Sequence, residues 1–219
     1  MQASFLDLVN LCDNVHIDWS SLTDTKFGSE QLSPFYLTTS LDSPVIGLLR
    51  PPIVDQLRKE NETTRAHGLR DTWSIIEQPP GLPNGLPIYR VSFNYWVDTA
   101  VKRSAIMKAL CERWRDTGLF EDVCGPKKWR SEPYPVYSNP FGKHDYPGDR
   151  DSGSNYAFEM ERSACALFGV VTYGVHMTIY RDSNEGLKQI WIPTRATTKP
   201  TYEFSHLKIL ATKMAWLSR

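Results

Sequence analysis

Residues 99–117 read TAVKRSAIMKALCERWRDT and carry the clearest periodicity in the chain. At the helical period, one apolar arc collects six side chains: Ala100, Ile106, Met107, Leu110, Cys111 and Trp114. Four polar side chains fall on the opposite side: Lys108, Glu112, Arg115 and Asp116. The pattern predicts a helix that buries the arc in a core and ends at Gly118. Arg103 is the one charge inside the arc, and we expect it to snorkel toward water.

The rest of the chain divides into short apolar runs between turn-forming residues. Extended segments are predicted at residues 36–37, 45–49, 73–76, 88–96, 134–137, 170–180 and 188–193. Further helices are predicted at residues 4–12, 53–60 and 161–169, and long loops at residues 78–87 and 139–154. Strands and helices do not alternate strictly. This order favours an α+β fold with a mixed sheet and packed helices, followed by a hairpin.

Composition sets limits on function and location. The chain has 219 residues, with 25 Lys plus Arg and 25 Asp plus Glu. A net charge of zero gives no bias toward polyanions, so we expect no nucleic-acid partner. No signal peptide and no apolar run of membrane-spanning length is visible, so we expect no membrane contact and a cytoplasmic location. The four scattered cysteines are then expected to be reduced thiols, most of them packed as small apolar groups.

Standard catalytic motifs are missing. The sequence has no phosphate-binding glycine loop, no dinucleotide fingerprint, no zinc-protease helix and no nucleophile elbow. The five histidines have no metal-ligand spacing, and residues 149–153 lack the later ligands of a calcium loop. We therefore assign no catalytic residue and no metal ligand to this chain.

Residues 127–134 form an aromatic and basic cluster that is a candidate ligand-binding segment. Trp129 stands between Lys128 and Arg130, with Glu132 two residues later. Such a tryptophan, flanked by guanidinium and carboxylate groups, can stack a planar cationic or heteroaromatic ligand. The alternative is a structural tryptophan with Arg130 and Glu132 paired at its edge.

Three segments of the sequence, taken together in this order, carry a family resemblance. They are GPKKWRSEPYPVY at residues 125–137, ERSACALFGVVTYGVHMT at residues 161–178 and IWIPTRATTKPTY at residues 190–202. In this order they resemble the thiamine-pyrophosphokinase-related Nudix hydrolases. The resemblance implies an N-terminal domain at residues 1–168, the start of a Nudix-like domain at residues 169–202 and a non-family tail at residues 203–219.

The same resemblance implies a chemistry that this sequence does not complete. Relatives of this kind carry a Nudix box, whose glutamates hold the Mg²⁺ or Mn²⁺ that polarises a diphosphate and activates water. Here the segment after Tyr202 reads EFSHLKILATKMAWLSR, without a glycine-rich turn and with Glu203 as its one acid. We therefore expect a truncated, inactive Nudix-type hydrolase with no cofactor of its own, whose complete relatives act on thiamine diphosphate or damaged analogues.

Candidate contacts for such a ligand follow from the cluster and from the resemblance. Trp129 and Arg130 are candidates for the organic end, and Arg195 and Lys199 for the diphosphate. Two other readings stay open: a non-catalytic binding or interaction module, and an enzyme centre dispersed over Arg130, Glu132, Asp149 and Glu161. The hairpin of residues 170–180 and 188–193 lacks a cover, so we also expect self-association through it.

Overall fold

The computed structural model describes residues 6, 15–16, 25–27, 29–78, 88–145, 155–174, 179–182 and 188–191. The chain falls into two compact units, Met1–Val171 and Thr172–Arg219, and each is described by itself. The strands of the first unit are β1 (Val15–His16), β2 (Lys26–Phe27), β3 (Glu30–Gln31), β4 (Ser33–Tyr36), β5 (Val45–Leu49), β6 (Trp73–Glu77), β7 (Tyr89–Phe93), β8 (Pro133–Tyr137) and β9 (Tyr156–Glu161). Its helices are α2 (Pro51–Ala66), α3 (Ala100–Asp116), α4 (Glu121–Cys124), the 3-10 turn η1 (Arg162–Ala164) and α5 (Cys165–Phe168).

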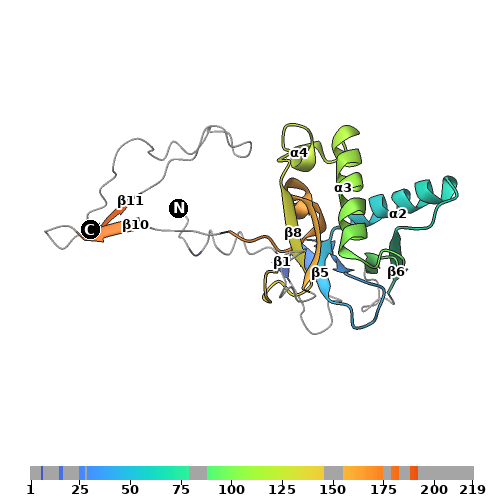
Figure 1. Cartoon of the computed structure of the whole chain (residues 1–219), viewed down its shortest axis with the longest axis horizontal. Coiled ribbons are helices and arrows are strands. Elements are labelled where there is room, and N and C mark those ends of the chain that lie inside the picture. The colour runs from blue at the N-terminus through green and yellow to red at the C-terminus, as the bar shows by residue number, and fades with distance from the viewer. Residues whose placement is uncertain are drawn as a thin grey trace. The chain divides into compact units, whose positions relative to one another are not determined.

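A mixed four-stranded sheet forms the centre of the first unit. Its strand order is β5-β4-β7-β6, with β4 and β7 parallel and the other neighbours antiparallel. Phe35 of β4 pairs with Val91 of β7, and both side chains are fully buried. Helices together with a sheet of both strand directions confirm the predicted α+β class (Figure 1).

Helix α3 forms where the sequence predicts it. Thr99 is its N-cap, and the Thr99 hydroxyl accepts a hydrogen bond from the Lys102 amide at 3.2 Å. Gly118, just past the C-cap, has φ of 71°, a left-handed value that glycine adopts without steric cost. The apolar arc is buried as expected, with Met107, Leu110, Cys111 and Trp114 at most 1% exposed.

The expectation that Arg103 snorkels into water is wrong. Its side chain is 7% exposed, and its guanidinium donates to the carbonyl oxygens of Val97, Asp98 and Ala157 at 3.3, 2.9 and 3.1 Å. Burial lowers the pKa of Arg103 below its usual range, while Asp98 raises it. The guanidinium thus joins the start of α3 to β9, because the carbonyls replace the water it gives up.

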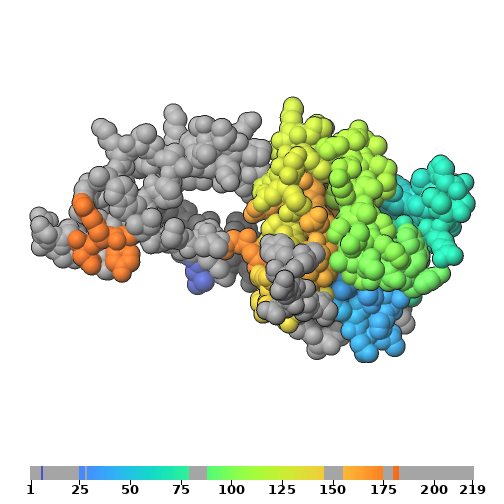
Figure 2. All heavy atoms as spheres, viewed as in Figure 1, coloured from blue at the N-terminus to red at the C-terminus, as the bar shows by residue number. Residues whose placement is uncertain are grey.

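The second layer is a two-stranded sheet against α3. Strand β8 pairs antiparallel with β9, and α3 packs along β9. In Figure 2 the segment of β9 and α5 reaches the surface between α3 and the residues around β8. The sequence predicts β8 but misses β9, although Ala157, Phe158 and Met160 of β9 are all buried.

Aromatic side chains join the two layers. Phe35 lies 5.5 Å from Phe93 and 6.0 Å from Phe168, measured between ring centroids. Phe168 in turn stacks on Trp114 of α3 at 5.6 Å, with planes 10° apart. Phe93 contacts Phe158 of β9 edge to face at 5.3 Å. These rings form one continuous core from the sheet through α5 to α3.

The backbone of β5 touches the backbone that follows α5. A Cβ on Gly47 would collide with the Phe168 carbonyl oxygen. A Cβ on Gly169 would collide with the Leu48 carbonyl oxygen and lie 2.8 Å from the Leu48 nitrogen. Gly169 also has φ of 55°. Two glycines therefore permit the close approach that brings Phe168 into the core.

Helix α2 runs from Pro51 to Ala66, beyond the predicted residues 53–60 at both ends, with prolines in its first turn. Its Asn61 belongs to an Asn-Glu-Thr sequon, yet its side chain is 4% exposed. The Asn61 amide donates to the Trp73 carbonyl at 2.7 Å and accepts from the Thr72 and Trp73 amides at 3.1 and 3.0 Å. In this fold Asn61 ties α2 to the start of β6 and is not accessible for modification.

The other predicted elements have mixed outcomes. The strands at residues 45–49, 73–76 and 134–137 and the helical turns at residues 161–169 are confirmed. The predicted helix at residues 4–12 lies outside the described residues, except Leu6, which is helical. In the second unit, β10 (Ile179–Asp182) and β11 (Lys188–Trp191) pair antiparallel, which confirms a hairpin. The prediction that its first strand begins at residue 170 is wrong, because residues 170–174 are not in a strand.

Candidate functional site

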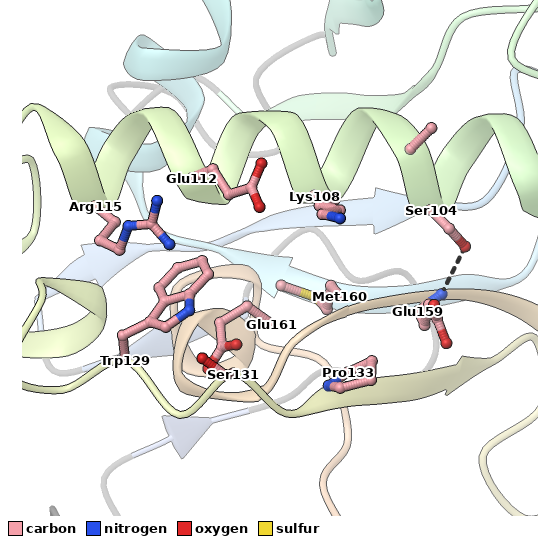
Figure 3. A pocket seen from close by; sticks show the side chains of 11 residues that line it. Ser104, Lys108, Glu112, Arg115, Trp129, Ser131, Pro133, Glu159, Met160 and Glu161 are labelled. Atoms are coloured by element: carbon pink, nitrogen blue, oxygen red, sulfur yellow. Dashed lines mark hydrogen bonds between the residues drawn. The ribbon is translucent and has the colours of Figure 1, made fainter.

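A cavity of about 500 Å³ lies between α3 and the β8–β9 layer of the first unit. We call it the α3–β9 groove (Figure 3). Eleven residues line it: Ser104, Ala105, Lys108, Glu112, Arg115, Trp129, Ser131, Pro133, Glu159, Met160 and Glu161. The volume falls within the range of small-molecule sites in proteins.

One wall of the groove is the polar face of α3. Ser104, Lys108, Glu112 and Arg115 follow one another at spacings of four, four and three residues, so they share a face of the helix. At one end of the groove, the Ser104 hydroxyl accepts a hydrogen bond from the Glu159 amide at 3.0 Å. It also donates to the Ala100 carbonyl at 2.8 Å. This bridge fixes β9 beside the helix.

Trp129 stands at the other end of the groove and is half-buried. The Arg115 guanidinium carbon lies 4.5 Å from the centroid of its ring, so the arginine covers one face of the indole. Arg115 also forms an ion pair with Asp116 at 2.7 Å. The arginine that stacks on Trp129 therefore comes from α3. The alternative interpretation paired Glu132 with Arg130, but the Glu132 carboxylate accepts a hydrogen bond from the Arg162 guanidinium at 2.5 Å.

Glu161 forms the floor beside Trp129 and is 7% exposed. Its carboxylate accepts hydrogen bonds from the amides of Arg130, Glu132 and Ser163 at 3.0, 3.2 and 3.1 Å. It also accepts from the Ser163 hydroxyl at 2.9 Å. Between the first two donors lies Ser131, whose φ of 54° is left-handed and costly for a residue with a Cβ. Glu161 thus holds the strained turn that carries Trp129.

Three carboxylates and two cations line the groove: Glu112, Glu159 and Glu161, with Lys108 and Arg115. The Glu161 carboxylate already accepts from four donors, three at Oε1 and one at Oε2, and Arg115 is paired with Asp116. Glu112 is half-buried and, within the described part of the chain, takes part in no hydrogen bond or ion pair. The groove therefore offers one half-buried carboxylate and the exposed Lys108 ammonium to a ligand.

Three thiols lie behind the groove and are all buried: Cys111, Cys124 and Cys165. Burial raises the pKa of the Cys111 thiol far above its usual value. Burial first, and then the Glu161 charge, raise the pKa of Cys124 to about 11 and that of Cys165 to about 12. Thiols of this kind stay protonated at neutral pH and are poor nucleophiles. The expectation of packed, reduced cysteines is confirmed for these three.

The structure brings one of the four sequence-predicted contact residues to the groove. Trp129 lines it, whereas Arg130 is exposed and does not, although its amide binds Glu161. Arg195 and Lys199 lie outside the described residues. Of the dispersed centre, Asp149 also lies outside them. Ligand binding at these positions stays a prediction.

The α3 wall is the part of the site that sequence reasoning missed. The row of Lys108, Glu112 and Arg115 was visible as the polar side of an amphipathic helix, where a solvated face is the ordinary interpretation. No local signal shows that β9, about fifty residues later in the chain, lies opposite this row. The partly apolar sequence of residues 156–161 is the local signal that could predict this strand.

Two kinds of feature are absent from the residues that the structure describes: a group of metal ligands and a membrane-spanning helix. In that part of the chain, no three His, Cys, Asp or Glu side chains are grouped to hold a metal ion. None of the described helices has both the length and the apolar character of a membrane span.

Comparisons with known proteins give two distant similarities. The chain is 23% identical over 209 residues to the uncharacterized protein YJR142W of Saccharomyces cerevisiae, covering 95% of this chain and 50% of that protein. It is 23% identical over 175 residues to Nudix hydrolase 20, chloroplastic, of Arabidopsis thaliana, covering 80% of this chain and 38% of that protein. No family model matches. The chain thus spans half or less of these relatives, and the second similarity supports a Nudix-related family.

Proposed function

We propose that this chain supplies the substrate-binding part of a Nudix-type diphosphate hydrolase whose complete form acts on thiamine diphosphate or damaged analogues. The similarity to Nudix hydrolase 20 over 80% of the chain carries the hydrolase part of this proposal. The α3–β9 groove supports the binding part, because its size suits a single heteroaromatic group with a short tail. The thiamine-like substrate follows from the family resemblance of residues 125–137, 161–178 and 190–202.

In this proposal the groove takes the organic end of the substrate. Trp129 offers an aromatic surface, and the turn held by Glu161 fixes where that surface stands. Arg195 and Lys199 are candidate diphosphate contacts by residue type alone, because a guanidinium fork and an ammonium both suit phosphate oxygens. In complete relatives Mg²⁺ or Mn²⁺ polarises the diphosphate. No residue of this chain is assigned to hold that metal, since the sequence contains no Nudix box.

We expect the 219-residue chain by itself to be catalytically silent. Purified protein with Mg²⁺ or Mn²⁺ should release no phosphate from thiamine diphosphate, its oxidised analogues or nucleoside diphosphates, because a metal-assisted attack has no glutamate ligand set here. Malachite-green detection of phosphate checks this, with a chelator-treated sample as the blank. Metal-dependent release that co-elutes with the protein and disappears with chelator contradicts the prediction.

Binding without hydrolysis is the positive expectation. Tryptophan fluorescence should change saturably on titration with thiamine diphosphate at up to about 1 mM, and Trp129→Ala should weaken the affinity about tenfold or more. Trp129→Phe should retain most of it, because the ring is kept. Trp96→Phe is the matched control: Trp96 is half-buried and bonds the Asp71 carbonyl, but it does not line the groove. Unchanged affinity in Trp129→Ala contradicts the assignment.

A further inference from the structure

The charges on α3 are arranged with alternating sign along the groove. Lys108, Glu112 and Arg115 stand in a row, and the middle one is a half-buried carboxylate that takes part in no hydrogen bond or ion pair among the described residues. Figure 3 shows Glu112 between Lys108 and Arg115, on the side of α3 that faces Trp129 and β9. Glu112 interacts with the Arg115 charge at a distance, but no donor bonds its oxygens, so a ligand donor in the groove would find both of them available.

The other two carboxylates of the groove differ from Glu112 in availability. Glu161 already accepts four hydrogen bonds, three at Oε1 and one at Oε2, so Oε2 alone could accept one more, whereas both oxygens of Glu112 are unbonded among the described residues. Glu159 is exposed, and its backbone amide is bound to Ser104 at the far end of the groove. Solvent screens a charge in that position. Glu112 is therefore the groove's available acceptor for a ligand donor.

The cations of the groove do not cancel this preference. Arg115 forms an ion pair with Asp116 at 2.7 Å and stacks on Trp129, so its guanidinium already has partners within the protein. Lys108 is exposed and lies one helical turn from Glu112. A ligand with a cationic ring near Glu112 and an anionic tail near Lys108 would match both charges.

We infer that Glu112 is a specificity-determining residue of the groove: it selects planar rings that carry a positive charge and lie against Trp129. This inference rests on the proposed function for the role of the groove, and it adds the chemical class of the ring and the residue that recognises it. The negative charge of Glu112 favours such a ring, whereas a neutral ring leaves the carboxylate unpaired. The preference for a charged ring over a neutral ring arises mainly because the neutral ring leaves Glu112 unpaired.

A matched pair of small probes tests the inference without thiamine. 1-Methylnicotinamide, methylated on the ring nitrogen, is a planar cation, and nicotinamide is its neutral counterpart with the same carboxamide group. By NMR titration up to about 10 mM, the chain should bind the cation about fivefold or more tightly than the neutral ring. Glu112→Gln should remove this preference and leave nicotinamide binding unchanged. Glu112→Asp, which keeps the charge, should retain part of the preference.

Glu159→Gln is the control within the same groove and should keep the preference to within about twofold, since its charge is exposed. Equal loss in Glu112→Gln and Glu159→Gln, an unchanged preference in Glu112→Gln, or no saturable binding of either probe overturns the inference. Thiamine diphosphate separates the two proposals. If it binds with an affinity that Glu112→Gln does not alter, the selectivity inference fails alone. If 1-methylnicotinamide binds in a way that depends on Glu112 but thiamine diphosphate does not bind, the proposed substrate fails and the role of Glu112 in selecting the ring stands.

Discussion

Gly169→Ala is expected to remove a large share of the stability of the first unit. The new Cβ would collide with the Leu48 carbonyl oxygen, and the backbone would have to keep φ of 55° with a side chain attached. Left-handed backbone costs about 1–2 kcal/mol and overpacking about 1–3 kcal/mol more, so the loss is roughly 2–5 kcal/mol. Whole domains have only about 5–15 kcal/mol of stability. Urea unfolding, followed by tryptophan fluorescence, measures the change.

Two other glycines separate the causes. Gly118→Ala has the same left-handed strain, with φ of 71°, but a Cβ there meets nothing within 4 Å. It should cost only the backbone part, about 1–2 kcal/mol. Gly47→Ala tests the collision, this time with the Phe168 carbonyl. If Gly169→Ala proves no worse than Gly118→Ala, β5 and the end of α5 are not in close contact.

Glu161→Ala should be the most damaging substitution in the groove. It removes four hydrogen bonds to a carboxylate that is 7% exposed and leaves three amides without their acceptor. Unmade buried hydrogen bonds cost about 1–3 kcal/mol each, and partial access of water lowers the sum to about 3–5 kcal/mol. The Ser131 turn also loses the group that holds its left-handed backbone. The expected result is a large fall in the urea midpoint and a shift in Trp129 emission.

Glu159→Ala is the matched comparison, because it removes an exposed carboxylate from the same strand. Its effect should stay within about 0.5 kcal/mol. Glu161→Gln, with one oxygen left to accept, should fall between the two. Equal midpoints for Glu161→Ala and Glu159→Ala would mean that the carboxylate does not hold the turn.

Local patterns predict this fold where the determining contacts are local. The 3.6-residue period, Thr99 and Gly118 define α3 almost to the residue, because caps and amphipathic faces act within one or two turns. The same reasoning fails for Arg103, whose buried guanidinium donates to the nearby Val97 and Asp98 carbonyls and also to the Ala157 carbonyl, 54 residues later in the chain. A local pattern does not show that such acceptors replace water around the charge.

The groove shows the same limit on a larger scale. The neighbours of Trp129 in sequence predict that it could bind a ligand. Glu112 is recognised as a groove residue only from the structure, in which β9 lies opposite α3. Glu161 looks like a helix-capping acid, and it does accept from Ser163. Its second role, holding the turn at residues 130–132, connects segments about thirty residues apart and has no local signature.

The aromatic chain from Phe35 to Phe168 has a consequence for synthesis on the ribosome. The sheet strands, residues 33–93, are made first, but the rings that cover them, Phe158 and Phe168, come near the end of the first unit. Until those residues emerge, Phe35 and Phe93 lack cover, and the nascent chain exposes aromatic surface that invites association. Contacts between residues so distant in sequence also slow folding. The ribosome must therefore synthesise the chain past Gly169 before the core of the first unit can form. Helix α5 is the last described helix of that core to be made.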